Sequence, residues 1–299
     1  MKHNLGGLVM QVGFEEYLNS QNKSQNTIEG YIRAVQDYIG WFSSSYGKEP
    51  SKLIQQNIDE FRSYLQTIKR QNAKTINYKL SSLKKYNEFL VDSGIQKDIV
   101  IIDKVMLKIQ QEYASPATVT EKDINRLRQA VLEQGSKRDY ALINLLAYTG
   151  VRISEALGIR LTDCHNIYQT KELIIMNGKG NKQRTVYLNE KVVSSLKDYI
   201  ANDRNTYTKA IDSDYLFVSN KNTSLDRITV NKMLNKYCEN AKLENITPHQ
   251  LRHFFCSNAL EKGFTVAEVA NIAGHSNIHT TLIYTNPSRA KMIEKVNSL

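Results

Sequence analysis

Cysteine, proline and tryptophan are scarce in this sequence. Its 299 residues include three cysteines, four prolines and one tryptophan. Cys164, Cys238 and Cys256 lie far apart and form no CxxC pair, so the sequence predicts neither a disulfide framework nor a zinc cluster. This usage favours a reducing compartment, and we expect a cytoplasmic protein.

Long apolar runs are missing as well. No stretch approaches the roughly 18 to 20 apolar residues of a membrane-spanning helix, and the opening MKHNLGGLVM is too short in its apolar run for a secretory signal. We therefore expect no membrane association.

Hydrophobic residues make up 41% and charged residues 23%, which is ordinary for a globular protein. The length suffices for two domains, each with its own core.

Positive charge is present in excess. Forty Lys and Arg residues stand against 30 Asp and Glu residues, which gives a formal net charge of +10. Such an excess favours a polyanionic partner, with nucleic acid the first candidate, although it also serves plain solubility.

Helical periodicity dominates the first part of the chain, to about residue 94. Four amphipathic segments begin near residues 13, 24, 55 and 73, and short polar turns join them as in a helical bundle. The fourth segment also carries basic residues among small polar ones, a pattern that suits contacts with a phosphate backbone but equally fits a solvated face. These basic residues are Lys74, Lys79, Lys84 and Lys85.

Residues 95–117 have weak periodicity and end in Ser115-Pro116, so we interpret them as an interdomain linker whose apolar part can pack on a neighbour. Helical patterns resume from Thr120. The one convincing β region has strands at about residues 173–176 and 184–188, with residues 166–168 as a candidate third strand. Further helices are expected at about 190–204 and 227–242. The sequence therefore predicts a mainly helical protein with a small antiparallel sheet.

The segment TPHQLRHFFCSNALEKGFTVAEVANIAGHSNIHTTLIYT, from Thr247 to Thr285, concentrates residues that can carry chemistry. It contains His249, Arg252, His253, His275 and Tyr284. The first three are spaced i, i+3 and i+4 on a helix that begins at Thr247-Pro248, so they share one helical face. Short helices are expected at 265–273 and from about 277, and His275 follows the glycine that ends the first of them.

Two kinds of site compete for these histidines. The i, i+4 spacing of His249 and His253 is that of a zinc helix, but Gln250 stands where that motif has its glutamate, and Arg252 would place a fixed cation beside the ion. Arginine with histidines and a tyrosine suits a phosphate group and a nucleophile aimed at it. The alternative is a helical hairpin whose histidines lie at the surface or in the core.

Two further elements carry cations. Arg152 follows an apolar helix in the segment TGVRISEAL, and a buried arginine needs a partner, either Glu155 or an incoming phosphate. The turn NGKGNKQ between the two strands holds Lys179 near its tip and Lys182 after it. This turn lacks the Lys-Ser/Thr ending of a nucleotide-binding loop.

TGVRISEAL, NGKGNKQR, TPHQLRH and AGHSNIHTTLIYT resemble, in order and spacing, the motifs of the tyrosine recombinase, or phage integrase, family. The resemblance extends over the whole chain and implies a four-helix SAM-like core-binding domain (1–94), the linker (95–117) and an α+β catalytic domain (118–299). The spacing from His275 to Tyr284 is its most specific element. Ala273 and Tyr187 depart from the family pattern, outside the reacting groups.

The resemblance implies a site that needs no metal and no cofactor. Its catalytic residues would be Arg152, Lys179, His249, Arg252, His275 and Tyr284, with Glu155 in support. Tyr284 would attack one DNA strand to form a 3′-phosphotyrosyl link, and Lys179, with Lys182 as a rival, would protonate the 5′-hydroxyl that leaves. His249 is our candidate for the base.

By the same resemblance, the partner is a double-stranded DNA recombination site. The protein would act as a homo-tetramer on paired sites, with the C-terminal segment 286–299 exchanged between protomers. The function expected is integration and excision, or resolution, of a mobile element or replicon. The alternatives are a DNA-relaxing enzyme of the type IB topoisomerase kind and a non-catalytic DNA-binding regulator with the same fold.

Overall fold

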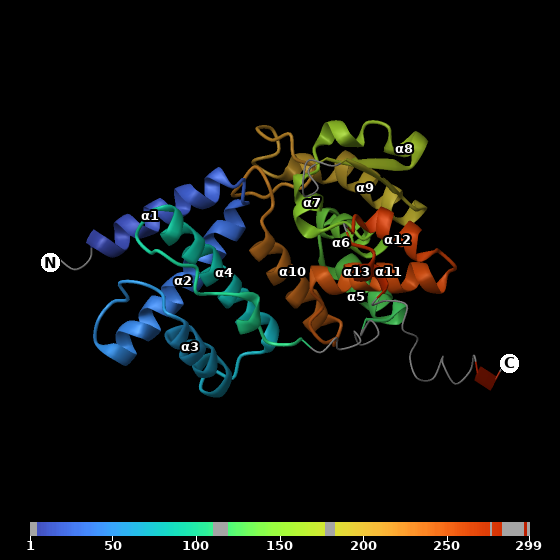
Figure 1. Ribbon diagram of the computed structural model, residues 1–299. Coiled ribbons are helices and arrows are strands. Elements are labelled where there is room, and N and C mark those ends of the chain that lie inside the picture. The colour runs from blue at the N-terminus through green and yellow to red at the C-terminus, as the bar shows by residue number, and fades with distance from the viewer. Residues whose placement is uncertain (1–4, 110–118, 177–182, 276, 283–295, 298–299) are drawn as a thin grey trace. The chain divides into compact units, whose positions relative to one another are not determined.

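The computed structural model describes residues 5–109, 119–176, 183–275, 277–282 and 296–297. The chain divides into two compact units, unit 1 (Met1–Gln111) and unit 2 (Glu112–Leu299), and each has its own hydrophobic core (Figure 1). The expected fold class, mainly helical with a small antiparallel sheet, is confirmed.

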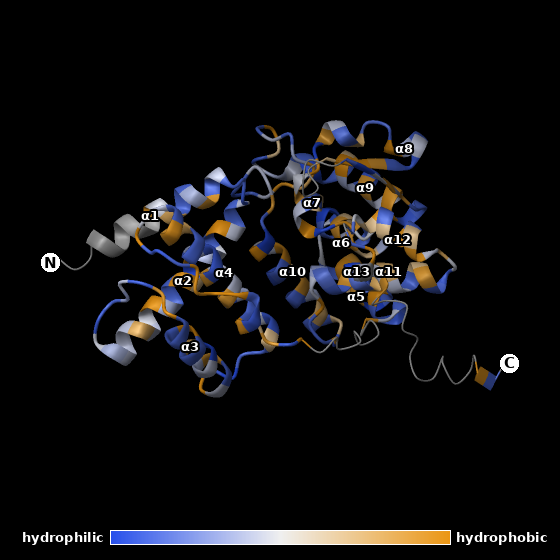
Figure 2. Ribbon diagram, viewed as in Figure 1, coloured by the Kyte–Doolittle hydropathy of each residue, from blue (hydrophilic) through white to orange (hydrophobic). Residues whose placement is uncertain are grey.

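Unit 1 is helical. It contains α1 (Leu5–Ser20), α2 (Gln25–Tyr46), α3 (Gln55–Thr67), α4 (Ala73–Asp92) and the short 3-10 turn η1 (Asp103–Val105). α4 contacts α1, α2 and α3, and apolar and polar residues alternate along these helices (Figure 2). The four expected helices are present, and α1 begins earlier than predicted. Ser24 and Asn72 cap α2 and α4 by accepting from backbone N–H groups of the first turn.

The segment that follows α4 packs on the core of unit 1 through a few of its apolar residues. Ile101 and Val105 are buried among the apolar residues of α1 to α4. The amide oxygen of Asn87 accepts from the backbone N–H groups of Val100 and Ile101, and Asn77 exchanges hydrogen bonds with the backbone of Leu107. Burial and these bonds hold the apolar part of the segment that the sequence pattern assigned to a linker, and this part was expected to be able to pack on a neighbour.

Ion pairs occupy three of the four lysines noted on α4. Lys79 pairs with Asp37 at 2.8 Å, Lys84 with Asp103 at 2.7 Å and Lys85 with Glu88 at 2.5 Å. An ion pair that remains partly exposed to solvent, as these three do, contributes little to stability.

Unit 2 begins with helices, continues through a hairpin and ends with helices again. Its first half contains α5 (Glu121–Gln134), α6 (Lys137–Thr149), α7 (Ile153–Gly158), η2 (Leu161–Cys164), α8 (Ile167–Thr170), β1 (Glu172–Ile175) and β2 (Arg184–Tyr187). Its second half contains α9 (Glu190–Asn202), η3 (Arg204–Thr206), α10 (Arg227–Asn240), α11 (Pro248–Glu261), α12 (Val266–Ala273) and α13 (His279–Leu282).

α6 is the central helix of unit 2. It contacts α5, α9 and α11, and its aliphatic residues are fully buried, as expected for a nearly continuous hydrophobic sequence. Capping boxes begin α5, α11 and α12, at Thr120, Thr247 and Thr265. Gly150 and Gly274 end α6 and α12 in the left-handed conformation, with φ of +66° and +70°.

The sheet of unit 2 consists of β1 and β2, which pair in antiparallel register with Leu173 opposite Val186. The candidate third strand at 166–168 is wrong. Ile167 begins the single turn α8 and is buried in the core, and Lys171 closes that turn with a φ of +55°. The helix expected from about Pro287 lies outside the described residues, apart from 296–297.

No helix in the part of the chain that the structure describes is long and apolar enough to cross a membrane.

Candidate active site

A buried carboxylate joins three elements of unit 2. Glu155, in the first turn of α7, has a side chain that is 4% exposed. Its Oε2 accepts from the Arg152 backbone N–H at 2.7 Å, and its Oε1 accepts from Arg152 Nη1 at 2.9 Å. Arg184, the first residue of β2, donates from Nη1 to Oε1 at 2.9 Å and from Nη2 to Oε2 at 2.7 Å. Burial alone would raise the pKa of Glu155, but the bonds from Arg184 and Arg152 outweigh it and lower the pKa.

Arg152 reaches from this carboxylate to α12. Its Nη2 donates to the carbonyl of Gly274 at 2.8 Å. The Arg152 side chain is 42% exposed although its partner Glu155 is buried, so part of the guanidinium remains open to a ligand. The sequence left open whether the partner of Arg152 is Glu155 or an incoming phosphate. In the structure Arg152 pairs with Glu155, and its exposed donors can still bind an anion.

A second arginine is buried on α11. Arg252 is 4% exposed, and its Nη1 donates to the carbonyl of Gly150 at 2.6 Å. Burial and the nearby Arg152 lower the pKa of Arg252 to about 10, which keeps the guanidinium charged at neutral pH. The cation is held by the carbonyl at the end of α6, where the helix dipole is negative.

His249 and His253 lie one turn apart on α11 and contact each other. Their Nε2 atoms are 2.9 Å apart, so one ring donates while the other accepts. Burial, then Arg252, lowers the pKa of His249. Burial, His249 and Arg252 lower the pKa of His253 to about 4. Both rings are therefore neutral near pH 7.

His275 stands directly after the end of α12. Its Nδ1 lies 2.7 Å from Oγ1 of Thr281, a buried residue of α13. Burial lowers the pKa of His275 to about 4, with contributions first from Arg252 and then from Arg152. The contact with Thr281 fixes the orientation of the ring.

The structure brings together five residues that the sequence singled out. They are Arg152, Glu155, His249, Arg252 and His275, from α7, α11 and the end of α12. Lys179, its rival Lys182 and Tyr284 lie outside the described residues. Arg184 and Thr281 were not selected from the sequence. The only signal for Arg184 was its place after the basic turn, and Thr281 had none.

The sequence suggested one possible metal site, the two histidines His249 and His253 on α11. Among the described residues, no group of three or more His, Cys, Asp and Glu side chains is arranged to hold a metal ion. The charge of Arg252 contributes to the lowered pKa values of His249 and His253.

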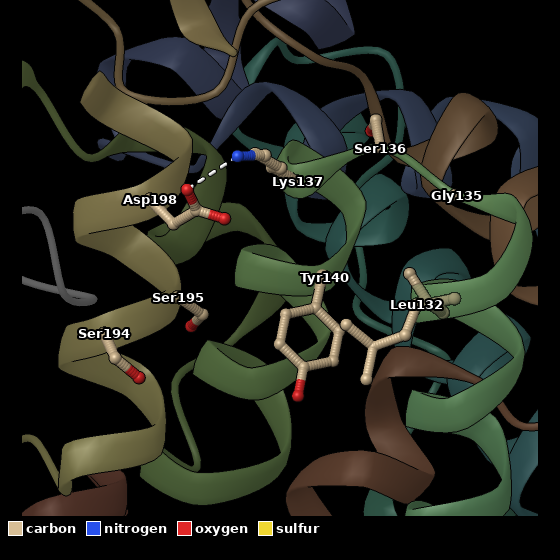
Figure 3. A pocket seen from close by; sticks show the side chains of 9 residues that line it. Leu132, Gly135, Ser136, Lys137, Tyr140, Ser194, Ser195 and Asp198 are labelled. Atoms are coloured by element: carbon tan, nitrogen blue, oxygen red, sulfur yellow. Dashed lines mark hydrogen bonds and ion pairs between the residues drawn. The ribbon is translucent and has the colours of Figure 1, made fainter. Parts of the chain in front are cut away.

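A cavity of about 470 Å³ lies elsewhere in unit 2, between α5, α6 and α9 (Figure 3). It is lined by Tyr140, Ser194 and Ser195 among others, and the ion pair of Lys137 with Asp198 spans 2.7 Å beside it. None of the arginines and histidines above lines it. The candidate site, where α7, α11 and α12 meet, is therefore separate from this cavity.

Sequence comparison gives two family matches and several relatives. Residues 117–291 match the phage integrase family, and residues 12–97 match the phage integrase N-terminal SAM-like domain. The chain is 52% identical over 286 residues to the TnP I resolvase of Bacillus thuringiensis, with 96% of this chain and 98% of that protein covered. It is 28% identical over 286 residues to the tyrosine recombinase XerA of Pyrococcus furiosus, with 95% and 91% covered.

Comparison with solved structures finds the same fold in a recombinase. The XerH site-specific recombinase, in a post-cleavage complex with a palindromic difH substrate, superposes with a TM-score of 0.73 at 21% identity. The match covers 92% of this chain and 80% of that chain. At this identity the likeness shows a shared fold.

Proposed function

Because the chain belongs to the phage integrase family of tyrosine recombinases, we propose that it is a site-specific recombinase that cleaves and rejoins DNA through a 3′-phosphotyrosyl intermediate. The observation that carries the proposal is the gathering of Arg152, Arg252 and three neutral histidines around one small region of unit 2. Such a set fits a phosphodiester, whose negative charge repels nucleophiles until cations neutralise it.

The two arginines have complementary roles in the proposed reaction. Arg252 is buried and tethered to Gly150, so its charge is fixed in place. Arg152 is held on one side by Glu155 and open on the other. Guanidinium groups keep their charge and can donate two parallel hydrogen bonds, so both suit the non-bridging oxygens of the scissile phosphate.

The histidines supply donors and proton carriers. With their pKa values lowered, His249 and His275 are neutral near pH 7, so each ring has one N–H donor and one acceptor nitrogen. His249 is our candidate for the base that accepts the proton of Tyr284. An incoming phosphate raises the pKa of both rings and makes them better proton acceptors.

Tyr284 and Lys179 complete the reaction in this proposal. The Tyr284 oxygen attacks phosphorus as its proton passes to the base, and the bond from phosphorus to the 5′-oxygen breaks. Lys179, or its rival Lys182, donates a proton to that oxygen. The phosphotyrosyl ester conserves the bond energy, so a new 5′-hydroxyl reverses the step without ATP or a metal.

The relatives support a proposal for the biological role. A relative that is 52% identical over nearly its whole length is called a resolvase, which favours resolution of a mobile element on double-stranded DNA. We propose a tetramer on paired sites, with residues 286–299 exchanged between protomers. The three cysteines are free and buried, which suits the reducing cytoplasm.

A nicked suicide substrate tests the chemistry. DNA taken from the regions that flank the gene should form a covalent complex with the native chain and none with Tyr284→Phe. Tyr187→Phe is the matched control, because Tyr187 is 62% exposed at the end of β2, and this variant should cleave normally. Failure to trap a complex on a DNA that the protein binds specifically would overturn the proposal.

Plasmids separate recombination from the alternatives. A recombinase should recombine two sites on one plasmid, whereas a type IB relaxing enzyme should only relax a supercoiled plasmid. A DNA-binding regulator should do neither.

A further inference from the structure

We propose that Arg184 is a positioning residue of the strand-transfer reaction, which fixes Arg152 and His275 through Glu155 and the end of α12. The inference rests on the function proposed above. Arg184 is only 12% exposed at the start of β2. It uses both terminal nitrogens on Glu155, and its Nε donates to the carbonyl of Ile272 at 2.9 Å.

The first consequence concerns the capacity of the carboxylate. Glu155 accepts four hydrogen bonds, two from Arg184 and two from Arg152, one of these from the backbone. A carboxylate offers about four acceptor positions. Because Arg184 fills two of them, Glu155 engages Arg152 through one guanidinium N–H only.

The second consequence is that Arg152 keeps donors for the substrate. Of its five side-chain N–H groups, two donate within the described residues, to Glu155 and to Gly274. A buried carboxylate must be compensated. Without Arg184, Glu155 would therefore draw a second N–H from Arg152 and rotate the guanidinium away from an anion at its exposed side.

The third consequence concerns His275. Arg184 donates to the carbonyl of Ile272, and Arg152 donates to that of Gly274. Two cations therefore bind the backbone just before His275. Gly274 has a φ of +70°, and a Cβ built there would lie 2.9 Å from the Arg184 guanidinium. The glycine thus allows the arginine to lie against the backbone that presents His275.

Hydrogen exchange on the full chain tests, without any DNA, whether Arg184 holds the backbone before His275. The amides of Gly274 and His275 donate to the carbonyls of Asn271 and Ala270, at 3.1 and 2.9 Å. In Arg184→Met, both amides should lose protection while those in the middle of α6 keep it. Unchanged protection at Gly274 and His275 would overturn the proposal.

A matched control exists in the same unit. Arg138 is also 12% exposed, donates twice to the carboxylate of Asp139 and once to the carbonyl of Val218. Arg138→Met removes an equally buried arginine far along the chain from α12. It should leave the amides of Gly274 and His275 protected. An equal loss of protection in this variant would mean that losing any buried arginine destabilises the unit, which would contradict a specific role of Arg184.

Single-turnover cleavage tests the catalytic consequence. Arg184→Met should bind its DNA site with native affinity but cleave about 100-fold more slowly, since small misplacements of reacting groups cause losses of that order. Arg184→Lys should recover part of the rate, because lysine restores one ion pair with Glu155 but not the paired hydrogen bonds from two terminal nitrogens. Native cleavage in Arg184→Met, or an equal loss in Arg138→Met, would overturn the proposal.

A modified substrate separates positioning from support of the fold. Replacing one non-bridging oxygen of the scissile phosphate by a methyl group removes the charge that Arg152 would neutralise. The deficit of Arg184→Met should shrink on this methylphosphonate, whereas a deficit of the same size on both substrates would refute a role through Arg152.

Two safeguards keep the outcomes apart. If Arg184→Met does not fold, Arg184→Met with Glu155→Gln removes the unpaired buried charge, and the same exchange and cleavage losses are expected of it. If the native chain forms no covalent complex, the proposed function fails, while hydrogen exchange still decides whether Arg184 holds the end of α12.

Discussion

Acidification is expected to destabilise unit 2 through its histidines. His253 and His275 have pKa values of about 4 in the folded chain, against 6.5 for an ordinary histidine. Each ring therefore binds its proton more readily after unfolding. The free energy of unfolding is at its full value above about pH 6.5 and falls as the pH drops from 6.5 towards 4.

The size of this effect follows from the two shifts. At full weight, a fall in pKa from 6.5 to about 4 corresponds to roughly 3 kcal/mol per ring. Each ring keeps contact with solvent, and the same arginines influence both rings, so about half of that is realistic. We expect a loss of about 2 to 4 kcal/mol for both rings together.

Urea unfolding of the full chain at a series of pH values measures this loss. Trp41 is the single tryptophan, so its fluorescence follows unit 1, and circular dichroism follows both units. The pH dependence of the unit 2 transition should be shallower in His253→Gln/His275→Asn than in the native chain. The variant His165→Gln, at an exposed position, should match the native chain. Equal pH dependence in the double variant and the native chain would refute the reasoning.

Three further predictions concern two contacts of the same region and the binding of DNA. Gly150→Ala should lower the free energy of unfolding by about 2 to 5 kcal/mol, measured by urea unfolding, because φ is +66° and the new Cβ would lie 2.3 Å from the Phe255 ring. Gly158→Ala, with no atom within 4 Å of its new Cβ, should change stability little. Thr281→Val should cost about 1 kcal/mol and release the His275 tautomer, seen by nitrogen NMR of the ring, and a fixed tautomer would contradict this. DNA affinity should fall by at least about 10³ between 50 and 200 mM salt in a filter-binding titration if six or more phosphates are contacted, and a flat response would exclude such an interface.

The histidine face of α11 illustrates what local sequence can decide. The spacing of His249, Arg252 and His253 placed them together because the helical period is a local property. The capping residue Thr247 and the proline after it marked the start of that helix, and the structure begins it at Pro248. The helix bounds and the glycine stops could therefore be predicted closely, with errors mainly at α1 and α8.

Arg184 illustrates what local sequence leaves open. It meets Glu155 across 29 residues and Ile272 across 88, and no periodicity contains these separations. The same is true of Ile101 and Val105, which the pattern assigned to a linker and the core of unit 1 buries.

The sequence by itself determined the helices, the order of the motifs and which charged and polar residues were available to act on a phosphate. Only the tertiary structure decided that Glu155 is shared by two arginines and that the histidines are neutral. The reason is physical: hydrogen-bond partners and burial depend on which distant segments pack together, and burial beside fixed cations is what lowers the pKa of His253 and His275.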